Sequence, residues 1–142
     1  MADVFSAEKR SAVMSAIRSK DTKPEIAIRS ALHRLGYRFR LHVSTMPGRP
    51  DIVLPRYATA IQIRGCFWHG HTCPDGHLPN SRRDYWIPKL SKNQNRDRRN
   101  DSKLRRSGWS LLIVWECQCT PSKLSKTIKR IERHLLNRRI PT

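Results

Sequence analysis

Apolar residues recur along this chain with two different periods, and the period separates predicted helices from predicted strands. In residues 22–36 they fall at helical spacing, with Thr22 as a candidate cap and Gly36 as a stop signal. The apolar stripe of this helix consists of Ile28, Ala31, Leu32 and Leu35. Residues 37–43 instead alternate strictly, which predicts a half-buried strand. Its apolar face consists of Tyr37, Phe39, Leu41 and Val43.

Three mostly apolar runs, 51–54, 58–63 and 109–116, predict buried strands. Residues 64–80 have no periodicity and are rich in Gly, His and Pro, which predicts a loop. Helical patterns cover residues 6–18 and 86–106, and a last helix opens at Thr120-Pro121. Its inward residues are Leu124, Ile128, Ile131 and Leu135. The order predicts one α/β domain over residues 1–142, with a mixed sheet flanked by helices.

The charge of the chain points to a polyanionic partner. Among 142 residues, 29 Lys and Arg face 11 Asp and Glu, a formal net charge of +18. Internal ion pairs cannot neutralise this excess, and nucleic acid is the usual partner of such a protein. No apolar run approaches the ~20 residues of a membrane span, and the first residues lack a signal-peptide core. We therefore expect a cytoplasmic protein without a membrane partner.

Four cysteines and a histidine suggest a metal site, because cytoplasmic cysteines are more often thiolates than disulfides. Cys66, His71 and Cys73 lie within eight residues, and Cys117 and Cys119 follow the last predicted strand. A structural zinc ion takes four tetrahedral S and N ligands, so three thiolates and His71 suffice and one cysteine is spare. The alternative is a set of ordinary buried thiols.

A second group of residues suggests hydrolytic chemistry. Asp51 begins a strand in "GRPDIVL", where its carboxylate can bind Mg²⁺ at the end of a sheet. The next strand carries "QIR" and supplies no second carboxylate. Glu25 is a remaining acid, although Thr22 and Glu25 also fit a capping box. His69 is a candidate general base, or alternatively a zinc ligand or a plain loop histidine.

Aromatic side chains lie beside cations in two places. Phe67 and Trp68 adjoin the cysteine loop, while Tyr85 and Trp86 begin a segment, 82–106, with ten Lys and Arg against three Asp. Such aromatics can wedge between base pairs while the cations hold phosphates. The alternative is packing in the core, which we expect for Tyr85.

Four stretches taken together resemble the very-short-patch-repair (Vsr) DNA mismatch endonucleases: "GRPDIVL", "GCFWHGHTC", "YWIPKLSKNQNRDRRND" and "GWSLLIVWEC". The likeness runs in order from about Met1 to Cys117. It implies a restriction-endonuclease-like core with a structural zinc, acting on double-stranded DNA. It also implies recognition of a T:G mismatch left by deamination of 5-methylcytosine, and a Mg²⁺-dependent nick 5′ of the T. We expect the enzyme to act as a monomer.

The resemblance also carries roles onto individual positions. Asp51 matches a magnesium ligand, with the main-chain carbonyl of Ile63 beside it, and Glu25 matches an acid near the site. His69 matches the histidine that handles the attacking water. The matching zinc ligands are Cys66, His71, Cys73 and Cys117. The expected DNA-binding residues are Met14, Ile17, Phe67, Trp68, Trp86, Lys89, Asn93 and Arg96.

Position 64 departs from the family pattern, which commonly has a second catalytic side chain such as His or Asp there. Arg64 cannot act as a base, but it can stabilise negative charge on a phosphate. Two other functions stay open: a related nuclease without mismatch preference, and a non-catalytic zinc-containing DNA-binding module. The presence of Asp51, His69 and Glu25 together argues against the second, because binding alone requires none of them.

Overall fold

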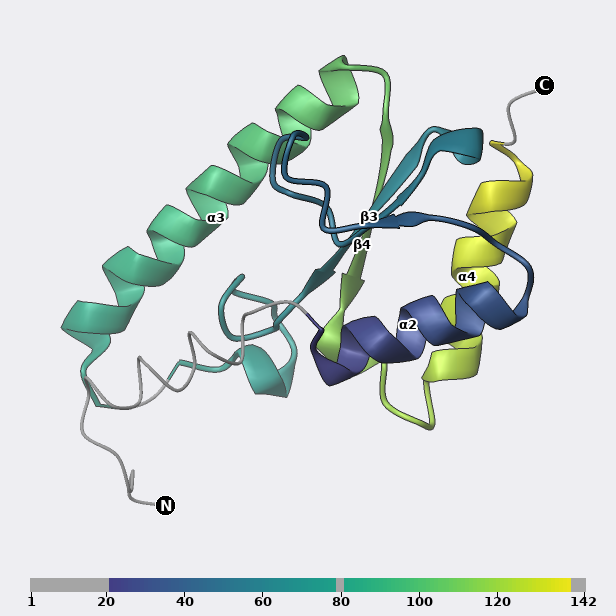
Figure 1. Ribbon diagram of the computed structural model, residues 1–142. Coiled ribbons are helices and arrows are strands. Elements are labelled where there is room, and N and C mark those ends of the chain that lie inside the picture. The colour runs from purple at the N-terminus through teal and green to yellow at the C-terminus, as the bar shows by residue number, and fades with distance from the viewer. Residues whose placement is uncertain (1–20, 79–80, 139–142) are drawn as a thin grey trace.

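The structure, a computed structural model, describes residues 21–78 and 81–138 (Figure 1). The predicted helix 6–18, with Met14 and Ile17, lies outside these residues. The main elements are α2 (Lys23–Arg34), β1 (Arg40–Leu41), β2 (Ile52–Leu54), β3 (Thr59–Arg64), α3 (Arg83–Arg106), β4 (Ser110–Trp115) and α4 (Leu124–Leu136). Short 3₁₀ turns are Pro55–Tyr57, Pro74–Gly76 and Glu116–Gln118. Within this part of the chain, no helix is both long and apolar enough to cross a bilayer.

The four strands form one mixed sheet, as the sequence predicted, and their order in the sheet is β1-β2-β3-β4. The β1/β2 and β2/β3 pairs are antiparallel, whereas β3 and β4 are parallel. Helix α3 supplies the crossover that two parallel neighbours require. Because Arg64 pairs with Trp115, the parallel strands β3 and β4 end side by side, and the residues that follow them leave the sheet at the same end.

Helices cover both faces of the sheet (Figure 1). On one face α2 and α4 pack against the strands around a core that includes Ile28, Ile61 and Ile131. On the other face Leu104 of α3 packs on Val53 and Ala60. These residues are almost completely buried, and each such aliphatic side chain contributes about 1.5–3 kcal/mol through burial.

The predicted strand 37–43 is wrong in extent, since only Arg40 and Leu41 pair with β2. His42 takes a left-handed φ of +47°, which interrupts the extended chain, and Leu41 is 40% exposed. Tyr37 is buried as expected, and its hydroxyl donates to Glu132 of α4 at 3.0 Å. The turn at His42 directs its ring to Glu25 instead of along a sheet face.

Two helix details also differ from the prediction. Leu35 is 50% exposed because α2 ends at Arg34 and Leu35 forms its C-cap. Gly36 follows with a φ of +97°, a conformation that favours glycine, so the predicted stop is confirmed. Helix α4 begins at Leu124 rather than at Thr120-Pro121, because residues 121–123 form a turn whose main chain bonds to Thr120 O.

Candidate active site and metal centre

The structure brings together four predicted ligands beyond the carboxyl ends of the neighbouring strands β3 and β4: Cys66, His71, Cys73 and Cys117. Their ligand atoms all lie within 4.8 Å of one another. The parallel register explains this convergence, because Cys66 stands two residues beyond the end of β3 and Cys117 two beyond the end of β4. Cys119 instead lies in the apolar core, where its thiol contacts Trp115 O at 3.6 Å.

The loop that carries these ligands is held by main-chain bonds and close packing. Cys66 N–H donates to Glu116 Oε1 at 2.9 Å, and His71 N–H donates to Cys66 O at 2.9 Å. The His71 ring stacks on Trp115 with centroids 4.2 Å apart. A Cβ at Gly76 would lie 1.9 Å from His71 O, so only glycine fits there. The ligand positions are therefore fixed by the fold itself.

The chemistry of this cluster suits a metal ion that prefers sulfur and nitrogen ligands. A tetrahedral zinc separates its ligand atoms by roughly 3.8 Å, and Cys117 Sγ lies 3.6 Å from His71 Nδ1. Burial raises the pKa of the Cys66 thiol. At Cys73 burial acts the same way, but hydrogen bonding with His71 and Cys66 outweighs it and brings the pKa to about 7. The cluster thus contains a thiol that ionises readily.

A cavity of about 920 Å³ lies between the N-terminal end of α2, the loop that precedes β2, the end of β3, and α3. Asp51 lines it, immediately before β2, and Asp51 Oδ2 accepts a 2.8 Å hydrogen bond from Ile63 N–H. Burial raises the pKa of Asp51 to about 6; the Ile63 bond opposes this rise and the charge of Glu25 adds to it. Burial therefore outweighs the groups that stabilise the negative charge of Asp51.

Glu25 lies close to Asp51 but does not line the cavity, and it has two roles in the structure. Thr22 Oγ1 accepts from Glu25 N–H at 3.4 Å, which makes Thr22 the predicted cap of α2. The Glu25 carboxylate, almost fully buried, bonds to His42 Nε2 at 2.9 Å and to Arg29 at 2.8 Å. It also accepts from Asp21 N–H at 3.3 Å. Capping and a place beside Asp51 are thus compatible in one side chain.

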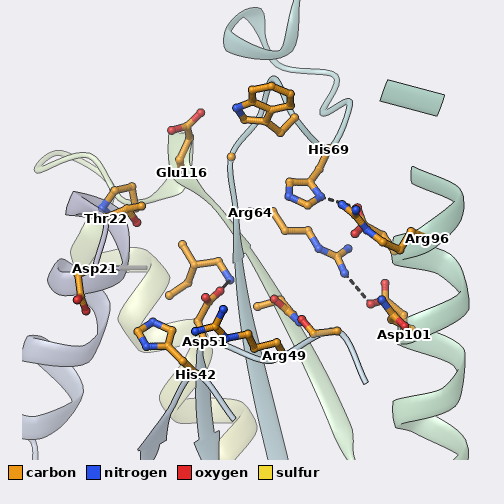
Figure 2. A pocket seen from close by; sticks show the side chains of 18 of the residues that line it. Asp21, Thr22, His42, Arg49, Asp51, Arg64, His69, Arg96, Asp101 and Glu116 are labelled. Atoms are coloured by element: carbon orange, nitrogen blue, oxygen red, sulfur yellow. Dashed lines mark hydrogen bonds and ion pairs between the residues drawn. The ribbon is translucent and has the colours of Figure 1, made fainter. Parts of the chain in front are cut away.

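On the α3 side of the cavity, His69 pairs through Nδ1 with Asp97 (Figure 2). Burial alone would raise the pKa of Asp97, but the hydrogen bond with His69 and the charges of His69, Arg64 and Arg96 outweigh it, so the pKa lies below its usual range. An ionised Asp97 fixes the ring and directs Nε2 of His69 away from α3. This is the arrangement of a histidine base and its orienting acid.

Arg64 reaches toward α3 from the end of β3, below His69 in Figure 2. It is buried, and its Nη2 donates to Asp101 Oδ1 at 2.6 Å. Both residues line the same cavity as Asp51. The predicted phosphate-binding cation is therefore present in the cavity but already has a carboxylate partner.

The predicted DNA wedge residues Phe67, Trp68 and Trp86 pack on one another in this structure. Their ring centroids lie 5.1–5.9 Å apart with edge-to-face geometry, and each ring is buried. Tyr85 packs against this cluster and is partly buried, in line with the core packing expected for it. The Lys89 ammonium lies 5.2 Å from the Trp68 ring centroid. The aromatics thus form a small core beside the metal loop.

Comparison with known proteins identifies the family. Residues 2–75 match the model of the DNA mismatch endonuclease Vsr. The type II nicking enzyme V.XorIIP of Xanthomonas oryzae pv. oryzae is 50% identical over 118 residues, 83% of this chain and 87% of that protein. The DNA mismatch endonuclease Vsr of Escherichia coli is 44% identical over 117 residues, 82% and 75% of the two chains. The chain belongs to the Vsr family. It is therefore a DNA endonuclease, and the resemblance seen in the sequence is confirmed.

Two acids of the Vsr cavity, Asp97 and Asp101, were not predicted from the sequence. Both lie on the inward face of α3, one turn apart, with Asn93 one turn earlier and Leu104 about one turn later. Their signal is periodicity: in a strongly basic helix, these acids fall at the spacing of the buried residues. Their partners, His69 and Arg64, come from a loop and a strand that only the folded chain brings to α3.

The helix α3 of this Vsr chain supplies the basic surface next to the cavity. Asn93 Nδ2 donates to Trp68 O at 3.2 Å, and Arg96 donates to Asn93 Oδ1 at 3.3 Å. Most of the ten Lys and Arg side chains of residues 82–106 are exposed. Helix α4 also has exposed Lys and Arg side chains, but it lies on the other face of the sheet. The two helices therefore offer a matched pair for testing where DNA binds.

DNA affinity is expected to fall by about 10³-fold or more between 50 and 200 mM salt if six or more phosphates are contacted. The double variant Lys89→Gln/Arg96→Gln should lower the slope of log affinity against log salt by about 2. The control Lys126→Gln/Lys129→Gln on α4 should leave the slope unchanged. Fluorescence anisotropy with a labelled duplex measures both. A larger change in the α4 variant would move the DNA-binding surface to the other side of the sheet.

Proposed function

We propose that this protein is a Mg²⁺-dependent DNA mismatch endonuclease that nicks the strand 5′ of the T in a T:G mismatch. Such mismatches arise when 5-methylcytosine is deaminated. The protein would act as a monomer on double-stranded DNA, with residues 1–142 forming one domain around a restriction-endonuclease-like core. Membership of the Vsr family and the mixed sheet with helices on both faces support this proposal.

One observation carries the proposal: Asp51 and the His69–Asp97 pair line the same cavity beside a basic helix. Hydrolysis of a phosphodiester needs a base for water, a site for a metal ion and positive charge around the phosphate. Figure 2 shows Asp51 on the α2 side and His69 and Arg64 toward α3, so the scissile phosphate would lie between them.

The donor set at Asp51 fits Mg²⁺, which takes oxygen ligands. Its buried carboxylate has a raised pKa, and Ile63 lies against it through the main chain. Asp51 and the carbonyl of Ile63 would hold the ion, and Glu25 would keep the surrounding charge negative. Bound there, Mg²⁺ supplies positive charge at the phosphate and makes a water molecule more acidic.

The side chains of the chain itself divide the remaining work. Asp97 holds Nδ1 of His69, so Nε2 accepts the proton of the attacking water. Arg64 would donate to the phosphate oxygens, whose negative charge grows in the transition state. His69 and Arg64 lie on the α3 side of the cavity, opposite the proposed metal ligand Asp51 (Figure 2).

The cluster of Cys66, His71, Cys73 and Cys117 would hold a structural zinc ion. Four closely spaced S and N atoms fill a tetrahedral shell, which leaves no position for substrate. Since Cys66 and His71 bracket Phe67, Trp68 and His69, the ion would fix the loop on which the base stands.

Mismatch recognition is proposed for the aromatic cluster and α3. A mismatched pair unstacks at lower cost than a matched pair, so insertion of Phe67, Trp68 and Trp86 favours T:G sites. These rings are buried against one another, so insertion requires the cluster to open when DNA binds. The remaining proposed DNA contacts are Lys89, Asn93 and Arg96, with Met14 and Ile17 from outside the described residues.

A nicking assay tests the function directly. With Mg²⁺, a duplex with one T:G pair should be nicked 5′ of the T at least 10²-fold faster than the same duplex with C:G, because the mismatched pair unstacks at lower cost. That ratio corresponds to a barrier difference of about 2.7 kcal/mol. Equal rates on both duplexes would indicate a nuclease without mismatch preference. Binding without cleavage of either duplex would indicate a DNA-binding module.

A further inference from the structure

The buried pair of Arg64 and Asp101 joins the end of β3 to the C-terminal part of α3 in the wall of the cavity. Arg64 Nη2 lies 2.6 Å from Asp101 Oδ1, and the two side chains are only 8% and 12% exposed. They are 37 residues apart in the sequence. A buried guanidinium whose N–H groups find no acceptor is unfavourable, so the acceptor at Asp101 is what allows Arg64 to stay at this position.

The two acids on the inward face of α3 bond to different partners. Asp97 bonds to His69, and Asp101, one turn later, bonds to Arg64. Both acids line the cavity, together with Asp51. Two side-chain pairs thus stand one turn apart on one helix face, and Figure 2 shows Asp51 across from His69, Arg64 and Asp101.

The bond to Asp101 engages one edge of the guanidinium. A guanidinium has five N–H donors in a planar fork, so donors remain for a second acceptor. A carboxylate fixed by a helix removes the rotational freedom that a long arginine side chain has in a cavity of this size. The remaining donors are then held in one orientation before DNA arrives, which is the condition for strong stabilisation of transition-state charge.

We propose that Asp101 is a positioning residue for catalysis: it holds Arg64 so that the remaining guanidinium donors face the scissile phosphate. This inference rests on the proposed nicking function. Asp101 does not touch the DNA in this arrangement, and its effect on the rate passes through Arg64. The competing interpretation is a purely structural tie between β3 and α3.

A double-mutant cycle separates the two interpretations. Single-turnover nicking of a T:G duplex with Mg²⁺ is measured for Arg64→Ala, Asp101→Ala, the double variant and Asp101→Asn. Arg64→Ala should lower the rate by about 10²-fold, as the loss of one such donor does. Asp101→Ala should lower it by about 10-fold in the parent, and not at all in the Arg64→Ala background. DNA affinity should change by less than about threefold, since the effect is on orientation in the transition state.

Asp101→Asn supplies the conservative rescue. Its amide oxygen can accept the same hydrogen bond from Arg64, so nicking should stay within about threefold of the parent. Ser102→Ala, the exposed neighbour on α3, controls for changes to the helix and should have no effect. Thermal unfolding and zinc content are measured for every variant, because a purely structural tie would change these and the rate together.

Each result bears on one proposal. An Asp101→Ala rate equal to the parent, or an equal loss in both Arg64 backgrounds, overturns the positioning role while leaving the nicking function intact. If Asp101→Ala does not fold, a tenfold loss of rate in folded Asp101→Asn overturns it instead. A parent protein that nicks no T:G duplex removes the proposed function itself, and with it the basis for this role.

Discussion

Replacing Asp51 with asparagine is expected to abolish nicking and, at neutral pH, to stabilise the protein. The rate should fall by about 10³-fold or more, since the variant loses the proposed metal ligand and the charge that attracts the ion. DNA binding should persist or strengthen, because a negative charge beside the backbone is gone. Asparagine can still accept the 2.8 Å bond from Ile63 N–H, so the local main chain keeps its partner.

The gain in stability follows from the raised pKa of Asp51, about 6, which burial causes in the folded protein. The folded state binds this proton more tightly than the unfolded chain, where the pKa is near 3.9. Asp51 therefore favours folding below about pH 4, and this contribution is lost as the pH rises to about 6 and above. At pH 8 the variant should be more stable by about 1–3 kcal/mol, and near pH 4 the difference should vanish.

Urea unfolding of both proteins at pH 4 and pH 8, without Mg²⁺, measures this difference. Asp84→Asn is the control, because Asp84 is an exposed acid of α3 and its replacement should change stability by less than about 0.5 kcal/mol at either pH. Full nicking activity in Asp51→Asn would exclude the mechanism. An inactive variant that is less stable than the parent at pH 8 would contradict the burial argument alone.

The second large effect is expected at the metal cluster, where Cys73→Ser should lose zinc and fail to fold. Binding of a structural zinc is worth about 10–16 kcal/mol in small zinc domains, which matches or exceeds the whole stability of a typical protein. Metal analysis of the parent should give one zinc per chain. A chelator should unfold the parent, and the tryptophan fluorescence should change as zinc is lost, because the Trp115 ring stacks on His71.

Cys119→Ser is the matched control, since Cys119 lies in the apolar core and outside the ligand cluster. It should keep its zinc and lose about 1 kcal/mol of stability at most, because a hydroxyl can donate to Trp115 O as the thiol does. Loss of zinc from Cys119→Ser, with zinc retained in a Cys117→Ser variant, would show that the other cysteine is the ligand.

The sequence by itself determined the features that are encoded locally. Thr22 and Gly36 bracket α2 because a cap and a left-handed stop depend on a few adjacent residues. The order of strands and helices also followed from local periodicity, as did the basic surface of α3. The crowding of Cys66, His71 and Cys73 within eight residues predicted the cluster that the fold completes with Cys117.

Features that join distant segments were decided only by the tertiary structure. The strand over 37–43 shrank to two residues because His42 turns to Glu25, a partner 17 residues earlier. Phe67 is buried because Trp86 comes back from α3 to pack on it. Asp101 pairs with Arg64 because the sheet and helix meet there.

The physical reason for this division is the range of the forces involved. Helix caps, turns and alternating patterns depend on main-chain bonds and side-chain spacing within a few residues. Burial and ion pairing depend on which surfaces meet, and a chain must close long loops before such contacts form. Composition made the helix that carries Asp97 and Asp101 look like a purely basic surface, whereas the packing of α3 against the sheet made its inner face one wall of the cavity.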